Sequence, residues 1–570
     1  MRSPIATTSL ACLAVCAIVL TVQAQKPPPS GEPTHGEWGD RGDNTYANPV
    51  MPGDFSDLDA IRVGNDYYAI SSTLQYSPGI VVLHSRDLVN WRIAGHVVQD
   101  LTQVSPELNW NRMNRPGRGI WAGSIRYHEG KYWVYFTSPD DGIFMSTAKN
   151  AAGPWSATTQ VWRVTGWDDP CPFWDDDGQA WLVATNFARD EATGLSYNIH
   201  LFQMDASGEH LIPGSDRIIH QSRGSEANKL YKIDGIYYHY FSEVRAEGRV
   251  AMMERASRLD GPWETRQLIH VDKAVDKEPN QGGLVQIPEE HAQVTPPNPA
   301  ERVVPPMCGA VSGGSCAPSG QWYFLTHQGT GDWEGRAGVL LPVSWIDGWP
   351  VIGRVGPDGI GNMVWRGPKP VQGFPRTDVW ASDDFRETAL PPEWEWNYQP
   401  RAEKWSLSER RGYLRLHAFP PLRPGDFRSV GNVLTQRSMR TSRNQVTALF
   451  DLNGMADGQE AGLAHFAATY CTLAISRTGH VARLVLNLNG TRSDGPQIRQ
   501  QRVWLRSRWG YDGRSQFAWS IDGKTFHDIG APYQLTWGSY RGDRVGLYTF
   551  NDSAEHGYVD IGRFHYTASR

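Results

Sequence analysis

The sequence predicts an all-β protein in which a five-bladed β-propeller is followed by a β-sandwich. Turn residues are frequent, with 58 Gly and 38 Pro in 570 residues, so long helices are not expected. Aromatic residues are abundant, with 24 Trp, as in proteins built from short strands. A turn followed by an aromatic strand also recurs five times in the N-terminal part of the chain, which is the signature of a repeat architecture.

The recurring unit is a turn containing Gly or Asn, a spacer residue and an aromatic strand. It occurs at residues 64–68, 129–133, 177–181, 234–238 and 319–323. The units lie 48 to 85 residues apart, a spacing that fits one four-stranded propeller blade each. We therefore place the propeller at residues 45–365. The longest interval contains a Pro-rich insertion at 288–317, whose Cys308 and Cys316 either form a small disulfide or stay reduced.

The N-terminus has the pattern of a secretory signal. Arg2 precedes an apolar run, and Val22-Gln23-Ala24 offers small residues for cleavage, so residues 1–24 are predicted to be a signal peptide. The apolar run is too short for a membrane span, and we expect a secreted or periplasmic protein with no membrane insertion after signal removal. Residues 25–44, rich in Pro and Gly, are predicted to be a flexible leader.

A second domain follows the propeller. Residues 366–380 contain three Pro and two Gly and are predicted to be a linker. Residues 381–570 show short alternating segments such as Tyr413–His417, which predict a β-sandwich accessory domain. Cys171 and Cys471 are expected to be isolated thiols.

Composition narrows the class of partner. The net charge is −6 and no basic run is present, which argues against a nucleic-acid partner. Trp and Tyr rings pack on the apolar faces of sugar rings, so the aromatic content suits a carbohydrate partner. Most of these rings are nevertheless expected to fill β-cores.

Three acidic residues each precede a strand of a different repeat: Asp57, Asp169 and Glu226. Inner strands of a propeller line its channel, so these carboxylates are expected to converge there. Mutual repulsion would then drive their pKa values apart, which supplies the protonated acid and the ionised base that glycoside hydrolysis needs. The alternative is that each is a turn or cap residue.

The motifs around these acids resemble glycoside hydrolase family 43. They include Phe55-Ser56-Asp57-Leu58-Asp59 and Asp169-Pro170-Cys171-Pro172-Phe173. Further matching stretches are residues 48–50, 78–80, 84–91, 226–232, 280–283 and 347–353. Residues 383–407 resemble the concanavalin-like, lectin-type sandwich of β-xylosidases in that family.

The resemblance implies an inverting mechanism in which Asp57 is the general base, Glu226 the general acid and Asp169 the residue that orients the acid and raises its pKa. Asp57 and Glu226 are then expected about 6.5–9.5 Å apart, with room for a water. Asp59 and Asp168 are expected to be structural. No cofactor is required, no metal ligand is assigned, and a structural calcium is possible.

The implied activity is exo-acting removal of terminal α-L-arabinofuranosyl or β-D-xylosyl units from plant cell-wall polysaccharides, that is, a β-xylosidase or α-L-arabinofuranosidase acting in xylan degradation. The alternatives are a non-catalytic carbohydrate-binding protein and an endo-acting arabinanase.

Three further residues are candidates for substrate binding. Trp121 either walls the sugar pocket or belongs to the core. His327 either meets sugar hydroxyls, holds a central water or ion, or is a satisfied core histidine. Arg336 either binds sugar hydroxyls, pairs with a catalytic carboxylate, or has only a surface role. Gly123 and Cys171 depart from the residues common in relatives, which leaves the identity of the sugar open.

Overall fold

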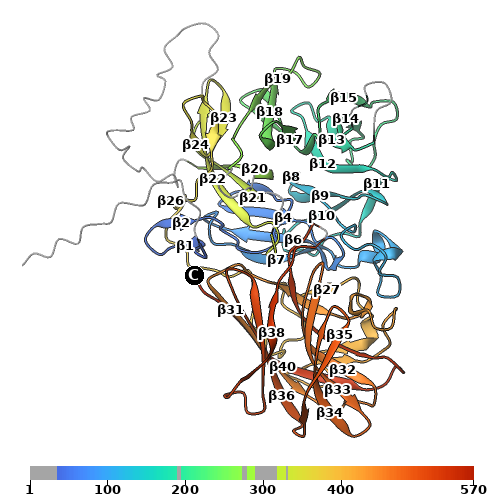
Figure 1. Ribbon diagram of the computed structural model, residues 1–570. Coiled ribbons are helices and arrows are strands. Elements are labelled where there is room, and N and C mark those ends of the chain that lie inside the picture. The colour runs from blue at the N-terminus through green and yellow to red at the C-terminus, as the bar shows by residue number, and fades with distance from the viewer. Residues whose placement is uncertain are drawn as a thin grey trace, which may run out of the picture.

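A computed structural model describes residues 35–188, 194, 196–272, 279–288, 318–328, 332–538 and 540–570. Strands dominate, and the propeller and the sandwich form two distinct bodies (Figure 1). The fold prediction is confirmed. The predicted signal peptide and the pair Cys308 and Cys316 lie outside the described residues. No helix of the described chain has the length and apolar character that a membrane span needs.

Each of the five blades is one antiparallel four-stranded sheet made from consecutive chain. Blade 1 is β3 (Asp59–Val63), β4 (Asp66–Ser71), β6 (Gly79–Ser85) and β7 (Arg92–Val98). Blade 2 is β8 (Gly123–His128), β9 (Lys131–Ser138), β10 (Gly142–Ala148) and β11 (Thr159–Trp162). Blade 3 is β12 (Trp167–Trp174), β13 (Ala180–Asn186), β14 (Asn198–Met204) and β15 (Arg217–His220). Blade 4 is β16 (Glu226–Ile233), β17 (Ile236–Arg245), β18 (Gly248–Ala256) and β19 (Glu264–Gln267). Blade 5 is β20 (Pro279–Ile287), β21 (Gln321–Gln328), β22 (Gly338–Ile346) and β23 (Trp349–Ile352).

The turns of the repeat in residues 64–68, 129–133, 177–181 and 234–238 are the hairpins between the first two strands of blades 1 to 4, and residues 319 and 320 precede the second strand of blade 5. The first strands β3, β8, β12, β16 and β20 contact one another around the centre. At the ring closure β20 passes so close to β3 that a Cβ on Gly283 would lie 2.4 Å from the Ala60 nitrogen, so only glycine fits. Asp59 ties blade 1 to blade 2 by accepting hydrogen bonds from the Ile125 N–H (2.9 Å) and from Arg126 (2.7 Å), which is a structural role.

The described part of the predicted flexible leader, residues 35–44, is packed rather than free. It contains β1 (Gly39–Asp40), which pairs with β2 (Thr45–Ala47). Trp38 is buried, and its indole N–H donates to the Ser569 carbonyl at the other end of the chain (2.8 Å). Prolines and glycines indicated flexibility, but burial of an indole outweighs the ordering cost of a short segment. Residues 366–368 of the predicted linker form β26, which also pairs with β2.

The C-terminal domain is a sandwich of an eight-stranded and a seven-stranded sheet. The first sheet is β35 (Thr491–Ile498), β34 (Val481–Leu488), β33 (Tyr470–Thr478), β32 (Gln459–Phe466), β39 (Arg544–Asn551), β30 (Leu434–Arg437), β27 (Glu395–Asn397) and β5 (Tyr76–Ser77). The second is β28 (Trp405–Ser406), β29 (Leu414–His417), β40 (Tyr558–Ala568), β31 (Arg443–Asp451), β36 (Arg502–Gly510), β37 (Arg514–Ser520) and β38 (His527–Gln534). The remaining elements are β24 (Arg354–Val355), β25 (Gly361–Asn362) and four 3-10 turns, η1 (Leu101–Gln103), η2 (Pro106–Leu108), η3 (Ala402–Lys404) and η4 (Phe427–Ser429). Cys171 and Cys471 are free and buried, as predicted.

The two domains share structure at their boundary. Strand β5, from the propeller part of the chain, completes the eight-stranded sheet by pairing with β27. Fully buried Glu395 binds two sandwich arginines, Arg437 (3.0 Å) and Arg544 (2.6 Å). Arg437 also donates to the backbone carbonyl of Asp54 (2.7 Å), so the sandwich supports the loop that leads to Asp57.

Candidate active site

The three predicted acids lie at the start of the inner strands, at one end of the channel. Asp169 and Glu226 sit at irregularities in β12 and β16, where the register with the next strand shifts. Asp57 precedes β3. The backbone adopts positive φ at Asp57 (55°), Asp169 (51°) and Ala227 (73°). Such bulges change the direction in which a side chain points. In blades 3 and 4 they direct Asp169 and Glu226 toward the same point.

Asp169 is buried and held by neighbours of Glu226. Its carboxylate accepts hydrogen bonds from the Ala227 N–H (2.7 Å) and from the Gln281 side-chain amide. Its backbone carbonyl accepts one from the Asn228 side chain (3.2 Å). Burial raises the pKa of Asp169, and the nearby Lys229 ammonium opposes that rise. The contacts fix the position of this carboxylate relative to Glu226.

Glu226 has the environment of a general acid. Burial raises its pKa, the negative charge of Asp169 raises it further, and Arg249 opposes the rise. One carboxylate oxygen lies 3.3 Å from Arg249 and 3.3 Å from the Asn280 amide. Burial also raises the pKa of Asp168, the residue before Asp169, well above its usual value, and the negative charge of Asp169 adds to this rise. Crowded acids therefore hold protons here more strongly than in water.

Asp57 occupies a different environment. Its carboxylate accepts a hydrogen bond from Arg336 (2.8 Å), so Arg336 pairs with this acid, one of the three alternatives stated for it. His327 Nε2 lies 3.8 Å from the same oxygen. Burial lowers the pKa of His327 to about 3, so its ring is neutral. Neither ring nitrogen of this fully buried histidine has a hydrogen-bond partner among the described residues, so it is not a satisfied core histidine. The other two alternatives for His327, a contact with sugar hydroxyls and a central water or ion, stay predictions.

Aromatic rings from both domains gather beside Arg336. Trp537 and Tyr540 of the sandwich lie 5.8 and 5.7 Å from its guanidinium carbon. Tyr540 also meets Trp121 edge to face at 5.8 Å between ring centroids, and Trp121 stacks on Phe187 at 6.4 Å. Trp121 is partly exposed, with its indole N–H on the Gly117 carbonyl (2.8 Å), so it belongs to this wall rather than to a core cluster.

Sequence reasoning missed several of these residues. Asn280 and Gln281 belong to a stretch that carried the family resemblance, so that stretch was a usable signal. Lys229 lies in another of these stretches, residues 226–232, whereas Arg249 belongs to none, since only the fold brings β18 to the acids. Tyr540 sits in a Trp- and Gly-containing turn that looked like any other hairpin.

Lys229 is fully buried and sets the orientation of Gln281. Its ammonium can only donate, and it donates to the Asn228 carbonyl (3.0 Å) and the Gln281 side-chain oxygen (3.3 Å). The Gln281 oxygen must therefore face Lys229, which leaves its NH₂ group to donate to Asp169.

The change Lys229→Met is expected to move the acidic limb of the kcat/KM profile to higher pH. Lys229 lowers the pKa of Asp169, so its loss raises that pKa, and Asp169 then becomes protonated at a higher pH. The profile is measured beside that of Lys131→Met, which removes an exposed lysine. A uniform fall in rate with no shift would mean that Lys229 only fills space.

Asn228 connects to a buried network of histidine and glutamate side chains. The Asn228 side-chain oxygen faces His239 (3.1 Å), and His239 faces Glu254 (3.2 Å). His220 contacts both Glu254 and Glu243 with its two ring nitrogens, and the contact with Glu243 is 3.2 Å long. Its hydrogen bonds to the two carboxylates outweigh burial and raise the pKa of His220 to about 9.

Stability from His220 is expected to depend on pH. Because its folded pKa of about 9 exceeds the usual 6.5, the stabilisation is complete below pH 6.5 and is lost as the pH rises through 9. The shift corresponds to roughly 3 kcal/mol. The Tm deficit of His220→Gln relative to wild type should therefore be largest at pH 6 and shrink by pH 10. A deficit that stays constant between these pH values would exclude a charged His220.

Comparison with known proteins gives consistent matches. Residues 46–294 match the family described as "Glycosyl hydrolases family 43", and residues 382–567 match the "Beta xylosidase C-terminal Concanavalin A-like domain". The chain is 30% identical to a beta-xylosidase of Formosa agariphila, covering 93% of this chain and 92% of that one. It is 30% identical to a non-reducing end alpha-L-arabinofuranosidase, BoGH43B of Bacteroides ovatus, over 65% of each chain. The crystal structure of BlXynB from Bacillus licheniformis is similar in fold (TM-score 0.74, 24% identity), covering 92% of this chain and 100% of that one.

Proposed function

Because this chain belongs to glycosyl hydrolase family 43 and is a glycoside hydrolase, we propose that it removes terminal β-D-xylosyl or α-L-arabinofuranosyl units from plant cell-wall polysaccharides or their oligosaccharides. The observation that carries the proposal is the contrast between two acids. Glu226 has a raised pKa beside buried Asp169, whereas Asp57 is bound by Arg336. The names of the relatives support both sugars.

The chemistry follows from this contrast. Glu226, protonated, gives its proton to the leaving oxygen as the glycosidic bond breaks. Asp57, ionised, takes a proton from the water that attacks the anomeric carbon from the opposite face, so the configuration inverts. Asp169 keeps Glu226 in place and favours its protonated form. This route needs no cofactor, because carboxylates supply both proton transfers.

The sandwich supports exo action. Trp537 and Tyr540 stand over Arg336, and Tyr540 also lies against Trp121, so this part of the rim is built by the second domain. A rim closed on one side suits a chain end better than the middle of a polymer. Secretion or export to the periplasm is proposed on the basis of the N-terminal sequence, and it would bring the enzyme to polymers that cannot enter the cytoplasm.

The proposal is tested with aryl β-D-xyloside and aryl α-L-arabinofuranoside, followed by ¹H NMR of the first product formed. We expect turnover of one or both and a product of inverted anomeric configuration. A retained configuration would contradict the roles given to Asp57 and Glu226. Oligomers of mixed length released from a linear arabinan would favour the endo-acting alternative. No turnover of either compound by the folded enzyme would point to a different terminal sugar.

A further inference from the structure

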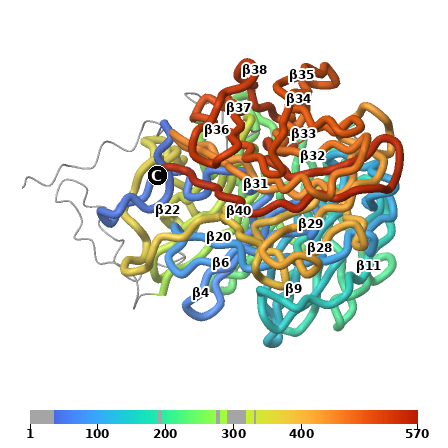
Figure 2. The backbone as a smooth tube through the Cα atoms, turned by 90° about the horizontal axis from the view of Figure 1, so that it is seen from below, coloured from blue at the N-terminus to red at the C-terminus, as the bar shows by residue number. Residues whose placement is uncertain are grey.

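The outer face of the seven-stranded sheet carries a concentration of arginines that the catalytic mechanism does not use. Along β36 the outward positions are Arg502, Trp504, Arg506 and Arg508, alternating with buried residues. Figure 2, which looks at the molecule from below, shows β40, β31 and β36 together in the sandwich. Strand β31 pairs with both of the others. Its Thr447 pairs with Arg506 on one side and His565 on the other, about 10 Å apart at two strand spacings.

A bulge in β40 adds a further arginine to this face. The register with β31 shifts at this point, and Arg563 adopts a positive φ of 50°. The extra residue restores the alternation, so Phe564 packs in the core while Arg563 and His565 stay exposed. A non-glycine residue rarely adopts this conformation, and β-bulges often re-aim a side chain.

A hollow of about 500 Å³ lies beside the bulge. It is lined by Asp384, Arg386, Arg411, Gly412, Tyr413, Gly562, Arg563 and His565. None of the three arginines forms an ion pair with any residue in the described part of the chain. The hollow has one acid, Asp384, so its three arginines leave two positive charges in excess.

Arginines without an acidic partner in the described chain continue from this hollow toward β36. The Arg563 guanidinium carbon lies 5.8 Å from the Trp504 ring centroid. Arg506 donates to the Thr447 hydroxyl (3.1 Å) and has no acidic partner within the described chain. Burial and the neighbouring Arg508 lower its pKa, which marks a cation without a counter-ion. The acids on this face are already bound: Asp451 by Arg410 and Arg502, and Asp560 by Arg410 and Arg415.

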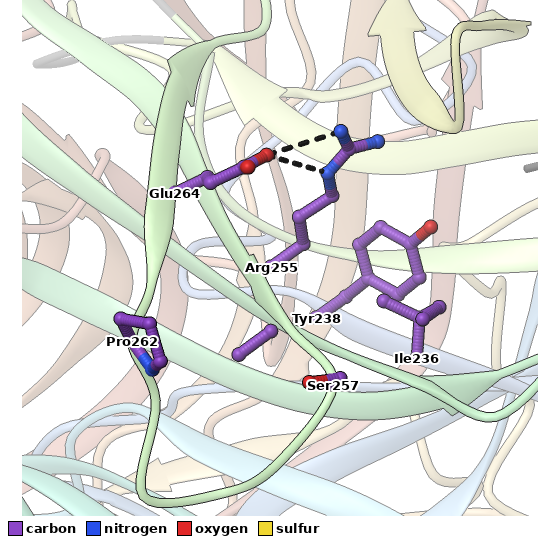
Figure 3. Close-up of a pocket in the computed structure, with 7 residues that line it drawn as sticks. Ile236, Tyr238, Arg255, Ser257, Pro262 and Glu264 are labelled. Carbon is purple, nitrogen blue, oxygen red and sulfur yellow. Dashed lines mark hydrogen bonds and ion pairs between the residues drawn. The ribbon is translucent and has the colours of Figure 1, made fainter. Parts of the chain in front are cut away.

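An arginine that lines another hollow of the molecule, Arg255, has its charge paired within the chain. At the outer part of blade 4, Arg255 lies against Glu264 with two hydrogen bonds (3.1 and 3.0 Å; Figure 3). It also donates to the Asp347 carbonyl (2.7 Å) and covers the Trp349 ring at 4.3 Å. Three of the five N–H donors of that guanidinium are used, and its charge is paired with Glu264. Within the described chain, Arg386, Arg411 and Arg563 beside the β40 bulge have no such side-chain hydrogen bond or ion pair.

We propose that Arg386, Arg411, Arg506, Arg563 and Trp504, together called the arginine face, bind the carboxylate groups of a uronate-bearing polysaccharide. A guanidinium binds a carboxylate through two parallel hydrogen bonds, and an indole ring packs on the apolar face of a sugar. An anionic lipid surface shares the charge but offers no sugar ring, and a sulfated glucan offers sugar rings but carries sulfates in place of carboxylates. The choice of a polysaccharide follows from the enzyme class, and the site is separate from the catalytic acids.

The test is affinity electrophoresis of the full chain in native gels that contain glucuronoxylan, with mobility normalised to a gel without polymer. The protein carries Glu226→Gln so that the polymer stays intact. Adding R386S, R411S and R563S is expected to weaken retardation at least tenfold. The matched control R112S, R163S and R499S removes three exposed arginines elsewhere that also lack ion pairs within the described chain, and should change retardation less than twofold.

The matched ligand is the same glucuronoxylan after chemical reduction of its carboxyl groups, which should bind at least tenfold more weakly. In the active enzyme, which keeps Glu226, the combined changes R386S, R411S and R563S should leave turnover of aryl glycosides unchanged. If they lower the Tm, the single change Arg411→Ser, in a turn, replaces them and should weaken retardation at least twofold. Equal retardation of variant and parent, equal binding of the reduced polymer, or equal binding of dextran sulfate or anionic lipid vesicles would each overturn the proposal.

Discussion

Glu226→Gln is expected to lower kcat/KM by about 10²–10⁴-fold on glycosides with poor leaving groups, because the amide cannot protonate the departing oxygen. The loss should be smallest with a dinitrophenyl leaving group, which departs without protonation. Gln keeps the size of the side chain and one acceptor for Arg249 and Asn280, so folding should be little affected. The measurement is kcat/KM for a series of aryl glycosides of increasing leaving-group pKa.

The control for this variant is Glu129→Gln, which makes the same chemical change at a residue whose side chain is 81% exposed. It should behave as wild type. A Glu226→Gln enzyme that loses the same factor with every leaving group would not have lost a general acid, and the assignment of Glu226 would then be wrong.

Asp57→Asn is expected to lower kcat/KM by about 10²–10⁴-fold with every leaving group alike, since each hydrolysis needs an activated water. The variant also leaves Arg336 without its anionic partner, which should weaken the order of the rim formed with Tyr540. The same series of aryl glycosides measures the effect. A slope against leaving-group pKa that differs from the wild-type slope would contradict the role of base.

Asp234→Asn is the matched control for Asp57→Asn. Asp234 has nearly the same backbone conformation (φ 50° against 55°) but lies exposed in the hairpin turn of blade 4. Asn tolerates this conformation as well as Asp does, so any loss specific to position 57 belongs to the carboxylate. If both variants lost activity equally, backbone disturbance rather than chemistry would be the cause.

The two variants together distinguish the acid from the base without a bound ligand. One loss depends on the leaving group and the other does not. Lys229→Met adds a third pattern, a shift of the acidic limb, because it acts on Asp169 through charge. Three different responses from three neighbouring positions would be hard to explain by a general disturbance of the site.

Much of the fold was predictable because its signals are local. In each blade a turn precedes the aromatic second strand, and both are properties of a few consecutive residues. The acids Asp57, Asp169 and Glu226 were predictable for a related reason, since each precedes an inner strand of a separate repeat. Equivalent positions of a propeller meet at its axis.

Other features could not be predicted because they join residues far apart in the chain. Trp38 packs near the C-terminus, so residues 35–44, the described part of the predicted leader, are packed against the rest of the chain. Lys229 and Gln281 reach Asp169 from two other strands, and Tyr540 reaches Arg336 from the second domain.

The sequence by itself determined the strand-built repeats, the sandwich and the three candidate acids. Only the tertiary structure decided the electrostatic environment of each acid, because a pKa depends on burial and on charges within a few ångströms, whatever their distance along the chain. For the same reason the arginine face became visible only when β31 brought β36 and β40 together.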